Sequence, residues 1–169
     1  VFAATDELLG GATFNVFTAA LLPGTVRARH GLKVVPDHTL EDCPPPHVLV
    51  IPGGFGTRAL LNRPSLLEWI RVKARKAEIV MSVCTGALVL AKAGLLDGLR
   101  VTTHHEQLAA LAELAPTATV DPNARFHDNP SPVGAGRLMT AAGISAGIDC
   151  SLHAVRQLVG ANAAAACAP

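Results

Sequence analysis

Two unbroken apolar runs dominate the pattern of hydrophobic and polar positions along the chain. Val48–Ile51 and Ile79–Val83 do not alternate apolar with polar residues. We therefore expect both faces of each run to be covered, as in a parallel sheet flanked by helices. Phe14–Phe17 and Leu138–Thr140 fit two further strands, and the stretch Val26–Val35 predicts a short hairpin or a bent excursion.

Apolar positions with helical spacing alternate with these strands. They predict four helices, over Pro64–Ala74, Ala87–Leu96, Leu108–Leu114 and Ala146–Leu158. We expect the last helix to bury Ile148, Leu152 and Val155. The alternation indicates a single α/β layered domain over residues 1–160, followed by a disordered Ala-rich tail at 161–169.

Composition and charge narrow the class of protein. The chain has 169 residues and a net charge of +1, and half of its residues are hydrophobic, which fits a globular protein. The basic residues at positions 71–76 lie on one predicted helix as a solvated face, so we expect no nucleic-acid partner. Apolar runs fall short of the roughly 18 residues of a membrane helix, and the N-terminus lacks the features of a signal peptide. We therefore expect no membrane partner.

The four cysteines, at positions 43, 84, 150 and 167, include no C-x-x-C pair. This spacing argues against a zinc site and against a disulfide framework. We expect a cytoplasmic protein with reduced thiols and without a metal or other cofactor.

Ser82–Ala87 holds the strongest candidate for chemistry. Cys84 follows an apolar strand, and a Thr-Gly step then opens a helix. A thiol at such a corner lies beside the positive end of the helix dipole, which favours the nucleophilic thiolate. The alternative is a small buried hydrophobic residue, but the carboxyl end of a strand faces the crevice where α/β sheets bind ligands.

Pro52–Gly56 is a glycine-rich loop directly after the strand Val48–Ile51. Glycine lets a backbone N–H approach a ligand closely. The spacing does not match the G-x-G-x-x-G dinucleotide pattern. A tight turn is one interpretation; the other is an oxyanion-type hole beside Cys84, with Gly54 and Thr85 as donors.

Two further segments lie at predicted strand ends. Thr102–His105 ends with two histidines, and if this segment is a strand their side chains point to opposite sides. We predict His104 as a base or orienting group, and His105 as solvated at the next helix. Gly143–Asp149 is a third Gly-rich corner, where Ser145 and Asp149 either cap the helix or wall the pocket around Cys84.

Together these motifs resemble the ThiJ/PfpI superfamily, whose fold is like that of class I glutamine amidotransferases. The matching stretches are Val50–Gly56, Ser82–Ala87, Gly94–Gly98, Thr102–His104 and Ala142–Asp149. The resemblance implies a flavodoxin-like three-layer sandwich with a mostly parallel central sheet, and a homodimer. The Cys-Thr-Gly step looks like the branch of isonitrile hydratases and of sensor domains of AraC-type regulators, whereas the protease-like branch has Cys-His-Gly.

For this branch the resemblance implies a hydratase that converts an isonitrile to an N-formyl amine through a thioimidate. Cys84 would be the nucleophile, with His104 as the second catalytic residue. The substrate-binding residues would be Gly53, Gly54, Phe55, Thr85, Gly86 and Ser145. The alternatives are a non-catalytic ligand or redox sensor, and an amidase or glyoxalase-type hydrolase.

Two family features have no counterpart in the chain. The proton-donating acid is expected shortly before a helix that ends near Val1–Phe2, and Asp6 and Glu7, which follow that helix, are weak substitutes. The first strand, which lies inside the family's sheet, is also absent. Because its loss would leave backbone groups unpaired, we expect a longer natural protein or another segment in its place.

Overall fold

The computed structural model describes residues 1–134 and 136–168. Its contacts divide the chain into two compact units, the first made of Val1–Pro44 and Val155–Pro169 and the second of Pro45–Ala154. The single domain expected over residues 1–160 stays a prediction.

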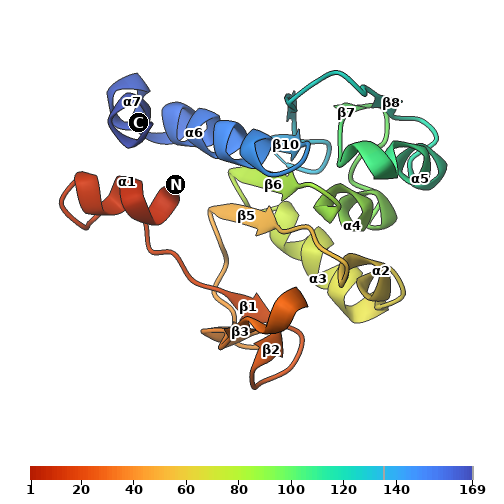
Figure 1. The fold of residues 1–169 in the computed structure, drawn as a ribbon, viewed down its shortest axis with the longest axis horizontal. Helices are drawn as coiled ribbons and strands as arrows, with labels where there is room; N and C mark the ends of the chain where they lie inside the picture. Colours follow the sequence, from red (N-terminus) through yellow and green to blue (C-terminus); the bar gives the residue numbers. More distant parts are fainter. Residues whose placement is uncertain (135, 169) are drawn as a thin grey trace. The chain divides into compact units, whose positions relative to one another are not determined.

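The second unit is built on a four-stranded sheet in the order β5-β6-β10-β9 (Figure 1). The strands are β5 (Val48–Ile51), β6 (Ile79–Val83), β9 (Phe126–Pro130) and β10 (Arg137–Ala141). β5 and β10 both run parallel to β6, while β9 is antiparallel to β10. The mostly parallel α/β sheet is confirmed, and β6 lies between the two strands whose carboxyl ends flank its own.

β5 is the edge of this sheet among the described residues, because its pairing is with β6 alone. Val50, in the middle of β5, has 38% of its surface exposed. The strand that the resemblance places inside the sheet is therefore not present beside β5 in the described part of the chain.

Helices and short strands complete the second unit. They are α2 (Thr57–Leu60), α3 (Pro64–Ala74), α4 (Gly86–Lys92), α5 (Leu108–Leu114), β7 (Arg100–Val101), β8 (Thr119–Val120) and the 3₁₀ turn η2 (His105–Gln107). α4 is the central helix: it contacts α2, α3, α5 and both parallel strands β5 and β6, and all its residues from Gly86 to Ala91 are buried. The position that follows β6 therefore leads straight into the core.

α6 (Ser145–Val159) begins in the second unit and continues into the first. Val155 is buried as expected, but Ile148 is 53% exposed. The covered stripe passes through Gly147, Cys150 and Ala154, because a Cβ on Gly147 would lie 2.7 Å from the Val83 side chain. Ile148 falls at the margin of that stripe.

The first unit contains short elements only. They are α1 (Phe2–Leu8), β1 (Ala19–Ala20), β2 (Val26–Arg27), the 3₁₀ turn η1 (Arg29–Gly31), β3 (Lys33–Val34), β4 (His38–Thr39) and α7 (Ala161–Cys167). β2 and β3 pair antiparallel, which confirms the hairpin, and β1 pairs parallel with β4.

The strand predicted at Phe14–Phe17 is wrong. The N–H groups of Thr13 and Phe14 donate to the Asp6 carboxylate at 2.7 and 2.8 Å, so a side chain takes the place of a neighbouring strand. The ring of Phe14 meets that of Phe2, with centroids 5.4 Å apart. A helix ending near Val1–Phe2 is also wrong, because α1 holds Asp6 and Glu7 within it.

Residues 161–167 form α7, where we expected a disordered tail. Ala163 and Ala164 are buried in a cluster with Val155, against which Val1 and Phe2 pack. Alanine has the highest helix propensity, and its methyl side chain lets α7 approach α1 closely. No helix in the described ranges is long and apolar enough to cross a membrane.

Candidate active site

Cys84 forms the corner between β6 and α4 with a backbone φ of 55°. A residue other than glycine in this left-handed region costs of order 1–3 kcal/mol and persists only where its surroundings fix it. The N–H of Cys84 donates to the carbonyls of Ala141 and Ala142, at 2.9 and 3.1 Å. Its carbonyl accepts from the Thr103 hydroxyl at 2.7 Å. Segments from two other parts of the chain thus hold the strained corner.

The glycine-rich loop after β5 lies directly against this corner. A Cβ on Gly53 would come within 2.8 Å of both the Cys84 Cβ and the Val83 carbonyl oxygen. Gly54 adopts a φ of 130°, a conformation that side chains rarely permit. Gly86, which also belongs to the corner, cannot carry a side chain, because a Cβ there would lie 2.2 Å from the Ile51 carbonyl oxygen and 3.1 Å from that of Pro52. The sequence motif therefore encodes a close backbone approach rather than an isolated turn.

The oxyanion donors differ from the prediction. The N–H of Gly54 donates to the Thr85 hydroxyl at 2.8 Å, so this donor is already engaged. The N–H of Thr85 donates to no acceptor among residues 1–134 and 136–168. Of the two predicted donors, Thr85 keeps its backbone group available and Gly54 does not.

His104 follows the threonine that holds Cys84. Its Nδ1 accepts from the N–H of Glu106 at 3.3 Å and caps η2. The two histidines would point to opposite sides only in a strand, and that condition is not met, because β7 ends at Val101. The His104 and His105 rings lie 4.3 Å apart. His105 is exposed at the start of η2, as expected. In the described part of the chain, no side chain hydrogen-bonds to the Cys84 sulfur.

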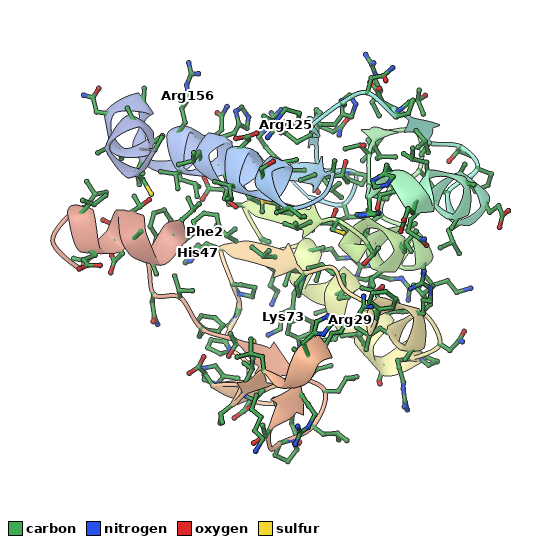
Figure 2. The ribbon with its side chains drawn as sticks, viewed as in Figure 1. Phe2, Arg29, His47, Lys73, Arg125 and Arg156 are labelled. Carbon is green, nitrogen blue, oxygen red and sulfur yellow. The ribbon has the colours of Figure 1, made fainter. Side chains whose placement is uncertain are left out.

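The third glycine-rich corner follows β10, on the other side of β6. A Cβ on Gly143 would lie 3.2 Å from Cδ2 of His104. Ile144 has a φ of 49° and is 87% exposed. Arg125, which is labelled in Figure 2, pairs with Asp149 and donates to the Ser145 hydroxyl at 3.2 Å. This contact shows neither that Ser145 caps the helix nor that it forms a wall of the pocket around Cys84.

Buried hydroxyl groups surround the corner, and sequence reasoning missed most of them. Besides Thr85, they are Thr57, Ser82, Thr102, Thr103 and Thr140. The Thr140 hydroxyl accepts from the N–H of Thr102 at 3.0 Å, whereas the Ser82 Oγ has no partner among the described residues. In the sequence, these hydroxyl groups could have been found from the position of Ser82, Thr102, Thr103 and Thr140 in or directly after strands. Thr57 begins α2 and has no such position.

The other three cysteines are free thiols away from this corner. Burial, reinforced by the carboxylates of Asp128 and Asp149, raises the pKa of the Cys150 thiol to about 12. Cys43 is buried too, and the Cys167 sulfur lies 3.6 Å from the Val1 carbonyl. Within the described ranges, no three His, Cys, Asp or Glu side chains cluster as a metal site would require.

Comparison with known proteins identifies similar chains of two functional kinds. The chain is 42% identical to the isonitrile hydratase of Pseudomonas putida over 139 residues, which are 82% of this chain and 57% of the hydratase. It is 34% identical to the HTH-type transcriptional regulator CdhR of Pseudomonas aeruginosa over 81% of this chain and 38% of the regulator. The chain thus spans little more than half of the first relative and less of the second.

A solved structure and a family model agree with these similarities. A ThiJ/PfpI family protein from Pseudomonas syringae superposes with a TM-score of 0.80 and 30% identity, covering 98% of this chain and 66% of that one. The model described as the DJ-1/PfpI family matches residues 2–157. The chain, with its strained cysteine between a parallel strand and a buried helix, belongs to the DJ-1/PfpI family.

Proposed function

We propose that this protein is a cysteine-dependent enzyme that hydrates isonitriles to N-formyl amines. The observation that carries the proposal is Cys84, a half-buried thiol at a strained corner whose backbone is fixed by Ala141, Ala142 and Thr103. A nucleophile held in one conformation needs less reorganisation on attack. The similarity to an isonitrile hydratase supports this substrate class.

The proposed reaction balances with water as the only co-reactant. The Cys84 sulfur bonds to the terminal isonitrile carbon, which also takes up one proton, and a thioimidate results. Water then adds to that carbon while the nitrogen gains a proton. The carbon–sulfur bond breaks, so the thiol is regenerated and the N-formyl amine leaves.

Residues beside Cys84 supply the rest of the proposed site. Gly53 and Gly86 supply the proposed backbone walls after β5 and β6, and Phe55 is proposed as a substrate-binding ring from the loop after β5. The Thr85 N–H is the donor proposed for developing negative charge. His104 is the proposed proton carrier. Asp6 is left out of the proposed site, because its carboxylate already binds the N–H groups of Thr13 and Phe14.

The test is turnover of an aryl isonitrile by the purified chain, with the formamide measured by chromatography and mass. We expect product with the wild type and with Cys167→Ser, which changes a half-buried thiol in α7. Cys84→Ser should reduce kcat at least a thousandfold, since the nucleophile is lost. Equal turnover by Cys84→Ser and the wild type would exclude the mechanism.

A second candidate is a ligand-sensing domain with the same pocket and no turnover. The similarity to the transcriptional regulator CdhR favours it, as does the lack of a hydrogen bond to the Cys84 sulfur among the described residues. Saturable binding of an isonitrile with no formamide, equally in wild type and Cys84→Ser, would support the sensor. Amide and 2-oxoaldehyde substrates in the same assay test the amidase and glyoxalase alternatives.

The proposed assembly is a homodimer. Light scattering during size-exclusion chromatography should give twice the chain mass of 17.4 kDa, and a mass of one chain would contradict it.

A further inference from the structure

The loop beside Cys84 is held at one residue, Gly54, through both its N–H and its carbonyl. Its N–H donates to the Thr85 hydroxyl at 2.8 Å. Its carbonyl accepts from the Thr57 hydroxyl at 2.8 Å and from the Thr85 hydroxyl at 3.1 Å. The two threonine oxygens lie 3.2 Å apart. Both polar groups of one loop residue are therefore held by two side chains.

Each hydroxyl hydrogen in this arrangement has an acceptor, and the backbone N–H of Thr57 also donates to the Gly54 carbonyl at 3.2 Å. Gly54 offers one N–H, and Thr85 uses a lone pair to accept it while donating its own hydrogen to the Gly54 carbonyl. Thr57 donates its hydrogen to the same carbonyl over the shorter distance. Thr57 and Thr85 are only 3% and 8% exposed, so water competes little for these bonds.

We infer that Thr57 and Thr85 are positioning residues that fix the backbone of Gly54 beside Cys84. Thr85 follows the nucleophile in the chain, and Thr57 opens α2 after the loop. Their two hydroxyls join the end of the loop to the cysteine corner. We call these hydrogen bonds of Thr57 and Thr85 to Gly54 the clamp. The clamp also explains the φ of 130° at Gly54, because the two hydroxyls hold this residue in a conformation that only glycine adopts easily.

The clamp has a consequence for the geometry around the sulfur. It keeps Gly53 seated against the Cys84 Cβ, where a side chain would clash, and it turns the Gly54 N–H away from any ligand. Thr57 and Thr85 therefore set the position of one wall of the pocket. The role of this wall in turnover rests on the function proposed above, whereas the clamp itself does not.

The direct test is amide hydrogen exchange at Gly54, resolved by NMR. In the wild type this amide should exchange at least about tenfold more slowly than an unbonded loop amide. Thr57→Val and Thr85→Val should each speed its exchange by about fivefold, the effect of one lost hydrogen bond. Thr57→Ser and Thr85→Ser keep the hydroxyl and should restore the wild-type rate. An unprotected Gly54 amide in the wild type overturns the inference.

Thr5→Val is the matched control. Thr5 is a fully buried threonine whose hydroxyl donates to the Val1 carbonyl in α1. The clamp predicts that the Gly54 amide exchanges faster in Thr57→Val and Thr85→Val. In Thr5→Val the exchange rate of the Gly54 amide should equal that of the wild type. Uniformly faster exchange at all amides, or an unchanged Gly54, would overturn the positioning role. If the valine variants do not fold, the exchange rate of the Gly54 amide in the wild type and in the serine variants still tests the inference.

Alkylation provides a second readout that does not depend on turnover. A loosened loop should raise the rate at which Cys84 reacts with a bulky aryl maleimide by about fivefold relative to iodoacetamide. On the proposed function, KM for the isonitrile should rise by a similar factor, with kcat changing less. A wild type without turnover would contradict the proposed function and leave the exchange and alkylation tests of the clamp intact. An unchanged ratio of alkylation rates in both valine variants would overturn the clamp.

Discussion

At the residue scale, the conformation of Cys84 depends on polar groups far away in the sequence. Thr103 lies 19 residues further along the chain, and its hydroxyl binds the Cys84 carbonyl. Ala141 and Ala142 come from the end of β10, and their carbonyls bind the Cys84 N–H. A strained cysteine is thus stabilised by partners that the local motif does not contain.

Ser82 is the exception among the buried hydroxyls near the corner, because its Oγ has no partner in the described part of the chain. An unsatisfied buried hydroxyl costs about 1–3 kcal/mol. We expect Ser82→Ala to leave the free energy of unfolding unchanged or to raise it by about 1 kcal/mol, measured by urea denaturation. Thr140→Val is the control, since it removes the acceptor of the Thr102 N–H and should destabilise the protein. A loss above about 1 kcal/mol in Ser82→Ala would show that water satisfies the hydroxyl.

Cys84 and Cys150 should differ sharply as nucleophiles. Burial raises the pKa of Cys150 to about 12, helped by Asp128 and Asp149, so this thiol stays protonated at neutral and mildly alkaline pH. We expect iodoacetamide at about pH 8 to modify Cys84 in the folded protein and to leave Cys150 unmodified, as read by peptide mass. Comparable labelling of both thiols under native conditions would refute this, and labelling in urea is the control.

At the element scale, hydrophobic runs and glycine-rich corners predicted strands and turns correctly, whereas the run of small alanine residues did not reveal a helix. β5 and β6 have the predicted bounds. β6 is covered on both faces as expected, whereas the edge strand β5 leaves Val50 38% exposed. α7 was missed since its alanines give no periodic contrast, and its order depends on contact with α1.

Ala163 tests that contact. It is buried while Ala165, two positions on, is exposed. We expect Ala163→Asp to destabilise the α1–α7 cluster by about 2 kcal/mol or more, because it buries an unpaired carboxylate. The measurement is thermal unfolding with amide exchange over α1 and α7. Ala165→Asp changes the same chemistry on the exposed side and should have little effect; equal losses would contradict the packing.

At the scale of the whole molecule, stability in acid depends on aspartates, two exposed and one half-buried, that are bound by backbone and hydroxyl donors. The N–H and then the hydroxyl of Thr18 hold the pKa of Asp37 below 3.8. Thr39 does the same for the pKa of Asp42, and the Asn123 N–H for that of Asp121. A lowered folded-state pKa means that stability is present above the unfolded value and is lost as pH falls through the folded value.

Asp37→Asn should therefore be less stable than the wild type at neutral pH, and the difference should shrink as pH falls below 3.8. The charged acceptor binds Thr18 more strongly than an amide does, and protonation removes that advantage. Urea midpoints at about pH 7 and about pH 3 measure the difference. Glu113→Gln, on the exposed side of α5, is the control. A difference that persists unchanged in acid would contradict the assignment.

The sequence by itself determined the family, the parallel strands and the position of Cys84 at a strand-to-helix corner. These features are local: an apolar run, a corner, and glycines where no side chain fits, as at Gly53 and Gly86. Each of these features depends on only a few neighbouring residues, so it can be predicted from the sequence.

Only the tertiary structure decided which polar groups meet at that corner. It showed that the Gly54 N–H is bound by Thr85, that Thr57 and Thr103 act beside Cys84, and that His104 caps η2 without a bond to the sulfur among the described residues. Hydrogen bonds between residues about 20 to 60 positions apart depend on strand order and register, which no local pattern encodes. The sequence therefore locates the thiol, and the fold determines its surroundings.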